Sequence, residues 1–201
     1  MTAESPPSTS DLRARLRRLR RELDPAERAV LSRRIAALAF SLAGAAAARR
    51  IAVFASVPDE PDTAELMRRL RGAGAQLFLP RVRDYRRHIL EFVACEGALR
   101  ANRYGIREPG GGRRLAARWL DLAFVPLVGF DGTGARIGMG AGYYDRAFAF
   151  RRRRLAWRGP RLVGLAFACQ EAEHIEAAPH DIRLDAIVTE NGVKSFEGVA
   201  T

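Results

Sequence analysis

Cysteine, histidine and lysine are scarce in this chain of 201 residues. The two cysteines, Cys95 and Cys169, are far apart and have no second Cys or His at ligand spacing, which argues against a disulfide framework and a zinc site. No apolar run approaches the ~18 residues that a membrane span needs, so no membrane association is expected. The first ten residues lack a basic segment followed by an apolar one. We therefore expect a disordered tail over 1–10, no secretory signal and a cytoplasmic protein.

The rest of the composition is that of an ordinary globular domain. The chain is 48% hydrophobic and 28% charged, so we expect one α/β domain over 11–201. Its formal net charge is +11, and nearly all of its basic residues are arginine. This surplus fits either a nucleic-acid surface or a field that attracts small polyanions such as nucleotides. The densest arginine runs, within 17–21 and 151–154, are interpreted as solvated helix faces.

Apolar spacing predicts a pair of helices at the N-terminus. Four leucines at spacings of 4, 3 and 4 share one helical stripe: Leu12, Leu16, Leu19 and Leu23. Asp24 and Pro25 then form an N-cap followed by a proline at the first helical position, with Glu27 placed as in a capping box. This predicts a second helix, which buries Leu31, Ile35, Leu38 and Leu42.

The pattern changes after residue 50 to short apolar runs separated by helices and turns. A strand at 51–54, a helix capped by Asp62 and closed by Gly72 and Gly74, and a strand at 76–79 form a βαβ unit with parallel strands. Further strands are predicted at 89–93, 122–125, 162–167 and 186–188, and a helix at 142–153. The expected fold is a three-layer α/β sandwich with a mostly parallel, open, Rossmann-like sheet.

A long glycine-rich segment, 129–146, follows a buried strand and leads into a predicted helix. Gly138, Gly140 and Gly142 alternate, which lets the backbone approach a ligand and turn its N–H groups toward an anion, and Arg136 adds a guanidinium. The segment is neither a Walker A loop nor a GxGxxG dinucleotide motif. A phosphate site and a glycine turn that only packs a helix on a strand both fit this spacing.

Several acidic residues follow predicted strands or begin helices. Asp145 either complements the dipole of the helix that it begins or holds a divalent cation beside phosphate oxygens. Asp181 and Asp185 are either its partners or helix caps. Glu60 follows the first strand, where it is either solvated or accepts N–H donors from a pterin-like ring. The three histidines, at 88, 174 and 180, form no triad with Ser or Cys and are interpreted as surface residues.

The segment Arg136-Ile-Gly-Met-Gly-Ala-Gly-Tyr-Tyr-Asp-Arg146 resembles the signature of the 5-formyltetrahydrofolate cyclo-ligase family, roughly R-L-G-x-G-x-G-Y-Y-D-R. The resemblance covers about residues 12–193 in order. It includes the turn Leu23-Asp-Pro-Ala-Glu-Arg28, Leu79-Pro-Arg81, Tyr104-Gly-Ile-Arg-Glu-Pro109, Val125-Pro-Leu-Val-Gly-Phe-Asp131 and His180-Asp-Ile-Arg-Leu-Asp-Ala-Ile-Val-Thr189.

This resemblance implies an enzyme that uses ATP and Mg²⁺ to convert 5-formyltetrahydrofolate into 5,10-methenyltetrahydrofolate, releasing ADP and phosphate. The residues that it implies for ATP are Arg13, Arg136, Ile137, Gly138, Met139, Gly140, Ala141, Gly142, Tyr143 and Tyr144. Those implied for the folate, with a polyglutamate tail left open, are Ala55, Glu60, Tyr104, Gly142 and Tyr143, with Glu60 as the pterin anchor and Tyr144 nearby. Asp145 and Asp181 are implied as magnesium ligands, and Arg136, Tyr143 and Tyr144 as catalytic residues.

The sequence departs from the family pattern at two positions. Thr9 stands where the family usually has a phosphate-binding lysine, and Ala141 stands where some relatives carry a second lysine. Arg15, Arg17 and Arg18 are candidates to replace the lost positive charge. Two alternatives follow: a non-catalytic paralogue that binds folate, nucleotide or RNA through its arginine-rich helix, and another small-molecule kinase or ligase on this fold. The resemblance favours the enzyme, acting as a monomer without nucleic acid.

Overall fold

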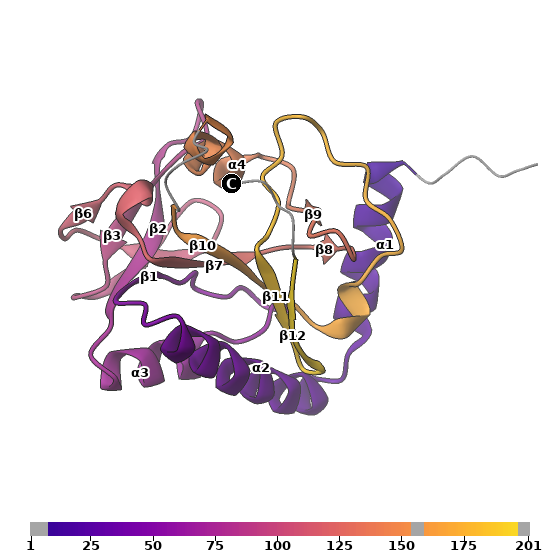
Figure 1. The fold of residues 1–201 in the computed structure, drawn as a ribbon, viewed down its shortest axis with the longest axis horizontal. Helices are drawn as coiled ribbons and strands as arrows, with labels where there is room; N and C mark the ends of the chain where they lie inside the picture. Colours follow the sequence, from indigo (N-terminus) through magenta and orange to yellow (C-terminus); the bar gives the residue numbers. More distant parts are fainter. Residues whose placement is uncertain (1–7, 154–158, 197–201) are drawn as a thin grey trace, which may run out of the picture.

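The computed structural model describes residues 8–153 and 159–196, and in these ranges a sheet of eight strands forms the centre of the molecule (Figure 1). From one edge to the other, the strand order is β12-β11-β10-β7-β1-β2-β3-β6. The strands are β1 (Arg50–Ala52), β2 (Gln76–Asp84), β3 (Ile89–Ala94), β6 (Arg114–Leu115), β7 (Leu122–Pro126), β10 (Arg161–Leu165), β11 (Ala186–Thr189) and β12 (Gly192–Ser195). The fold is mixed α/β, as the sequence predicts.

The five central strands, β11, β10, β7, β1 and β2, are parallel, and the strands at both edges are antiparallel. The predicted βαβ unit is confirmed, because β1 and β2 pair in parallel with Ile51 opposite Leu77. These central strands read as apolar runs because both of their faces are covered. Their carboxyl ends share one edge of the sheet, and the loops that follow them meet there.

The predicted N-terminal helices are present as α1 (Thr9–Glu22) and α2 (Pro25–Ala45). Ser8 caps α1, so the expected tail over 1–10 extends too far: residues 9 and 10 are helical, and residues 1–7 lie outside the described ranges. Asp24 caps α2 by accepting the N–H groups of Ala26 and Glu27, as predicted. None of the described helices is both long and apolar enough to cross a bilayer.

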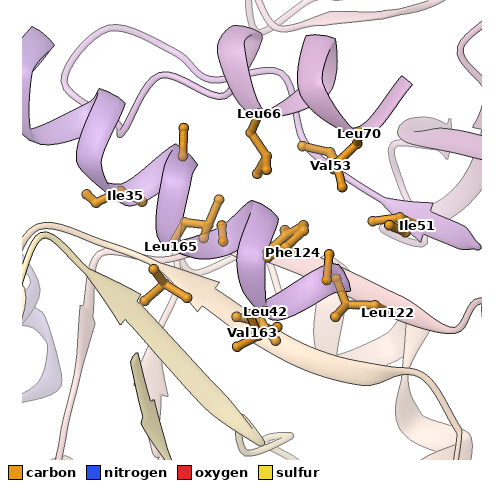
Figure 2. Close-up of a cluster of buried hydrophobic side chains, with 14 of the residues drawn as sticks. Ile35, Leu42, Ile51, Val53, Leu66, Leu70, Leu122, Phe124, Val163 and Leu165 are labelled. Atoms are coloured by element: carbon orange, nitrogen blue, oxygen red, sulfur yellow. The ribbon is translucent and has the colours of Figure 1, made fainter. Parts of the chain in front are cut away.

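The two faces of the sheet are covered unequally (Figure 1). Helices α2 and α3 (Ala64–Gly72) cover one face, where they pack on aliphatic and aromatic residues of β1, β7 and β10 (Figure 2). The other face is covered by the short helix α4 (Tyr143–Ala147), the 3₁₀ helix η2 (Ala149–Arg153) and connecting segments, around Phe78, Phe92 and Phe148. The third layer of the predicted sandwich is therefore mostly irregular.

A third cluster of apolar residues lies outside these two layers, beneath α1. It joins Leu12 and Leu16 to a small hairpin, β8 (Gly129–Phe130) with β9 (Arg136–Ile137), and to the chain after the 3₁₀ helix η3 (Ala168–Gln170). Helix α1 thus lies beside η3 and the hairpin, at the carboxyl edge of the central strands (Figure 1).

Several elements differ from the sequence predictions. The helix expected over 142–153 ends at Ala147 and continues as η2, because the buried Phe148 occupies its C-cap. Strand β2 runs past Pro80 to Asp84, and a hairpin of β4 (Leu99–Ala101) with β5 (Arg107–Pro109) was not predicted. Thr63, not Asp62, is the N-cap residue of α3, although Asp62 Oδ1 accepts the Ala64 N–H.

Candidate active site

Helix α1 is fixed to the carboxyl edge of the sheet by a close apolar contact. Leu16 is fully buried and lies directly over Gly129, where any side chain would overlap Leu16 Cδ1. Gln170 stabilises the same region, because its Nε2 donates to the carbonyl oxygens of Leu127 and Val128 at 3.0 Å each. The position of α1 is thus set by apolar packing, which leaves its arginines available to line the edge.

The glycine-rich segment lies against α1 through Arg13, a residue that the family resemblance implies for ATP. Arg13 Nε donates to the Gly138 carbonyl at 3.0 Å. Gly140 and Gly142 have φ values of +101° and +65°, which L side chains rarely adopt, so glycine is required at both positions. Gly138 has no such constraint, and a Cβ there would meet no atom within 4 Å. The glycine at 138 therefore leaves open space beside the Arg13 side chain.

Arg136 and Asp145 form a partly buried ion pair at the start of α4. Both terminal nitrogens of Arg136 donate to Asp145 Oδ1, at 3.0 and 2.8 Å, and the Ile182 N–H donates to the same oxygen at 3.1 Å. The other carboxylate oxygen, Oδ2, takes part in none of these bonds. Asp145 therefore joins the glycine segment to the loop that carries Asp181.

Asp181 and Asp185 have different roles in the structure. Asp181 Oδ2 accepts the Ala178 N–H at 2.8 Å, and its side chain is 29% exposed. Asp185 is tied to Arg151, at 2.7 and 2.9 Å, and to the Leu162 N–H at 2.6 Å. The interpretation of the second arginine run as a solvated face is thus wrong for Arg151, whose side chain is only 10% exposed; Arg154 lies outside the described residues.

The described residues contain no cluster of three or more His, Cys, Asp or Glu side chains that could hold a metal ion by themselves. Asp145 and Asp181 lie on chain segments that meet where Asp145 accepts the Ile182 N–H. Asp145 Oδ2 takes part in none of the hydrogen bonds above, and Asp181 Oδ1 lies 3.7 Å from His180 Nε2. Two hard oxygen donors of this kind fit Mg²⁺, which takes one or two carboxylates and completes its shell with phosphate oxygens and water. The pair thus fits a shared magnesium site, not a self-sufficient one.

Glu60 lies buried at the carboxyl end of β1, beside a buried arginine of α1. Its Oε1 lies 4.0 Å from Arg20 Nη1, and its Oε2 accepts the Val57 N–H at 3.1 Å. Burial raises the pKa of Glu60, although the Val57 N–H and Arg20 act in the opposite direction. Arg20 is 3% exposed, so the interpretation of its run as a solvated helix face is wrong here too.

Tyr104 and Tyr143 belong to an aromatic rim formed by three chain segments. Tyr85, at the tip of the β2–β3 hairpin, contacts the Tyr104 ring at 5.5 Å, and His88 contacts the Tyr143 ring at 5.1 Å. Arg103 lies over Tyr85 and Tyr104, at 4.1 and 4.8 Å from their ring centroids. The interpretation of His88 as a plain surface residue therefore missed a contact with a candidate site residue.

The hydroxyl groups of the rim and of Tyr144 differ in acidity. Interaction with Tyr143, followed by Arg103, lowers the pKa of Tyr104, whereas burial, followed by Tyr104, raises the pKa of Tyr143 to about 12. Burial, followed by the charge of Glu60, raises the pKa of Tyr144. Tyr143 and Tyr144 thus stay protonated at neutral pH, the Tyr144 hydroxyl under the influence of the Glu60 charge and the Tyr143 ring in contact with His88.

The other predicted residues contribute backbone more than side chains. Ile137 is buried in the cluster beneath α1, so its side chain does not face a ligand, whereas Met139 is 60% exposed. Ala55 follows Phe54 at the end of β1, and Ala141 O accepts a hydrogen bond from Arg146 Nη1. The loops after β1, β7 and β10 thus meet beside α1.

Cys95 lies apart from this arrangement, whereas Cys169 belongs to η3, which lies beside α1. Both cysteines are half-buried rather than fully buried, and the Cys95 carbonyl accepts a hydrogen bond from Arg71 Nη2 at 2.9 Å. A cavity of about 520 Å³ lies here, at the beginning of β2, and its lining includes Gln76 and Arg113. It is at the edge of the sheet opposite the carboxyl ends of the parallel strands, so it is not the candidate site.

Known proteins with similar sequences indicate which family the chain belongs to. A model of the 5-formyltetrahydrofolate cyclo-ligase family matches residues 6–190. The 5-formyltetrahydrofolate cyclo-ligase of Escherichia coli K12 is 33% identical over 184 residues, which cover 89% of this chain and 98% of that one. The corresponding protein of Haemophilus influenzae is 29% identical over 179 residues, which cover 86% and 92%.

Solved structures show the same fold. The 5,10-methenyltetrahydrofolate synthetase of Aquifex aeolicus matches with a TM-score of 0.79 and 28% identity, over 96% of this chain and 95% of that one. A synthetase from Mycoplasma pneumoniae, at 22% identity and a TM-score of 0.73, supports the fold alone. The expectation of a ligase of folate metabolism is confirmed, and the chain belongs to the 5-formyltetrahydrofolate cyclo-ligase family.

Proposed function

We propose that the protein converts 5-formyltetrahydrofolate into 5,10-methenyltetrahydrofolate and couples this cyclisation to the cleavage of ATP into ADP and phosphate. The observation that carries the proposal is the convergence on α1. Arg13 contacts the glycine segment at Gly138, and Arg20 lies beside the buried Glu60. One helix thus connects a segment suited to phosphates with a carboxylate suited to a pterin.

The folate is assigned to the side of Glu60. A buried carboxylate there would accept N–H donors of the pterin ring, and a paired acceptor and donor of this kind discriminates strongly against rings that lack the donors. Ala55 lies in the loop that joins β1 to Glu60. Tyr104 and Tyr143, on the aromatic rim, would cover the rest of the folate, with Gly142 next to Tyr143.

The ATP phosphates are assigned to residues 136–144 of the glycine-rich segment and to Arg13. Open space at Gly138 and the left-handed backbone at Gly140 suit backbone contacts with phosphate oxygens. Thr9 begins α1 and is exposed, and Ala141 has no charge, so neither supplies the lysine contact of the family pattern. Asp145 and Asp181 are proposed to hold Mg²⁺, which would neutralise charge on the phosphate oxygens.

The chemistry requires positioning and charge neutralisation rather than a protein nucleophile. The formyl oxygen attacks the γ-phosphorus, the bond to ADP breaks, and an iminium phosphate forms. N10 then attacks the formyl carbon, the carbon–oxygen bond breaks to release phosphate, and N10 loses its proton. Arg136, held beside Asp145, is proposed to lie near the transferred group, and Tyr144, which stays protonated, is proposed to donate a hydrogen bond there.

The placement of the arginines supports a small anionic ligand over RNA. Arg13 and Arg20 of α1 are engaged by the glycine segment and by Glu60. Their guanidinium groups are therefore turned into the edge of the sheet, away from the open surface that a nucleic acid would need. The proposed enzyme acts as a monomer in the cytoplasm.

The test is a spectroscopic assay of turnover. Purified protein supplied with 5-formyltetrahydrofolate, ATP and Mg²⁺ should produce the absorbance of methenyltetrahydrofolate, with stoichiometric release of phosphate. Asp145→Asn should lower kcat by about 100-fold or more, because it removes a ligand charge and the pair with Arg136. Glu173→Gln, an exposed acid, is the matched control and should keep full activity. A folded protein without turnover would refute the proposal.

A further inference from the structure

Three arginines of α1 lie on one stripe of the helix. Arg13, Arg17 and Arg20 follow one another at spacings of four and three residues, which places their side chains on the same face. The first contacts Gly138 of the glycine segment and the last lies 4.0 Å from Glu60. Arg17 therefore lies on the same face of the helix, between the glycine-rich segment and Glu60.

Arg17 has no partner that explains its position. Its Nε is buried, and among the described residues this atom has no hydrogen-bond partner and Arg17 forms no ion pair. Arg17 and Arg20 repel each other. The Arg17 side chain is partly buried, and no acidic side chain of the described residues forms an ion pair with it, so an anion bound at this place would stabilise it.

Arg20 also has a buried Nε without a hydrogen-bond partner, but its guanidinium is paired with Glu60. The neighbouring arginines off this stripe are in a different environment. Arg15 and Arg18 are exposed, and Arg18 pairs with Glu22 one turn along the helix, at 3.6 Å. Of the three candidates to replace the charge missing at Thr9, only Arg17 faces the edge of the sheet. Arg17 does not occupy the place of the missing lysine, however. Thr9 lies one turn before Arg13, at the beginning of α1, whereas Arg17 lies one turn after it.

The position of Arg17 along α1 suggests which anion it meets. At a rise of 1.5 Å per residue, Arg13 and Arg20 are separated by about 10 Å along the axis, with Arg17 about 6 Å from the first. In the proposed reaction the phosphoryl donor lies at the glycine segment and the pterin lies at Glu60. The group that passes from donor to acceptor must cross the interval between them.

We infer that Arg17 is a catalytic residue, which binds oxygens of the γ-phosphoryl group as this group passes from ATP to the formyl oxygen. The inference rests on the proposed function and gives a specific role to one of the three arginines named above as candidates to replace the missing charge. A guanidinium suits this role because its planar donors match phosphoryl oxygens in pairs. Charge on these oxygens is best stabilised by a cation that is already in place before the reaction.

The experiment combines turnover with binding. Arg17→Gln should lower kcat by about 100-fold, whereas Arg33→Gln, an exposed arginine of α2, should leave kcat unchanged. Isothermal titration with Mg²⁺ then compares ADP with a non-hydrolysable ATP analogue. The Arg17→Gln variant should bind the analogue at least fivefold more weakly than the wild type and bind ADP unchanged. Arg17→Lys, which keeps the charge, should restore part of kcat.

The outcomes separate this inference from the proposed function. Wild-type protein that binds both nucleotides but does not turn over refutes the proposed function, while the binding comparison still decides whether Arg17 contacts the γ-group. Equal weakening of ADP and analogue, or wild-type kcat in Arg17→Gln, overturns the inference. Thermal unfolding checks that each variant is folded. If Arg17→Gln does not fold, the same comparison is made with Arg17→Lys, for which wild-type kcat and analogue affinity overturn it.

Discussion

Leu16→Ala tests whether the candidate site depends on how α1 is packed. Leu16 is fully buried over Gly129 in the cluster beneath α1, so its truncation should leave a cavity. Removal of a buried leucine side chain costs about 3 kcal/mol of unfolding free energy, which is about 6–12 °C in Tm for a chain of this size. Urea and thermal unfolding measure this loss. The variant should also bind ATP more weakly, because α1 carries Arg13, Arg17 and Arg20.

Leu70→Ala is the matched control for this prediction. Leu70 is 2% exposed and also lies on a helix, α3, but it belongs to the main core against α2 (Figure 2). We expect a similar loss of stability and no change in the Kd for ATP, measured at a temperature where both variants are folded. An equal effect of both substitutions on the Kd for ATP, or a loss below about 1 kcal/mol for Leu16→Ala, would refute the reasoning.

Two further predictions concern the segment between β8 and α4. Burial raises the pKa of Asp131, but hydrogen bonds from Thr133, Ile175 and Ala135 outweigh burial and lower it. Its contribution to stability is therefore present above the unfolded pKa and lost as pH falls through the folded pKa. Asp131→Ala should destabilise the protein by about 3 kcal/mol at pH 7 and by progressively less as the pH is lowered below the ordinary pKa of aspartate; a loss in urea midpoints that does not depend on pH would contradict this. Gly142→Ala should lower the unfolding free energy by about 1–2 kcal/mol because residue 142 has a left-handed φ. Gly138→Ala should leave Tm unchanged but weaken ATP binding. Unchanged ATP binding in Gly138→Ala would show that phosphates do not contact this position.

The sequence predicted the parallel centre of the sheet well, because its strands are short apolar runs that need both faces covered. The sequence did not predict strands whose backbone pairing occurs without a pattern of apolar residues. Strand β2 continues through Pro80 because it pairs there with the antiparallel β3, a setting that a proline in an apolar run does not reveal. The β4–β5 hairpin has mostly polar residues that pair at the surface, so no apolar pattern predicted it.

At the site, the motif residues could be found from the sequence but the buried arginines could not. The contact of Arg13 with Gly138 brings together residues 125 positions apart, as the family pattern implies. Arg20 and Arg151 lie within runs of arginine, and such a run has the same composition whether its side chains meet solvent or a buried acid. Only the positions of Glu60 and Asp185 in the fold distinguish the two cases.

The packing of α1 also has a consequence for how the protein is made. Helix α1 is synthesised before its apolar partners, which follow it by more than 100 residues: Val128, Ala135, Ile137, Ala172 and Ile175. A nascent chain that ends before Ile175 lacks part of these contacts. Activity should therefore require synthesis at least as far as Ile175, and ligands that bind between α1 and the glycine-rich segment should act late in folding.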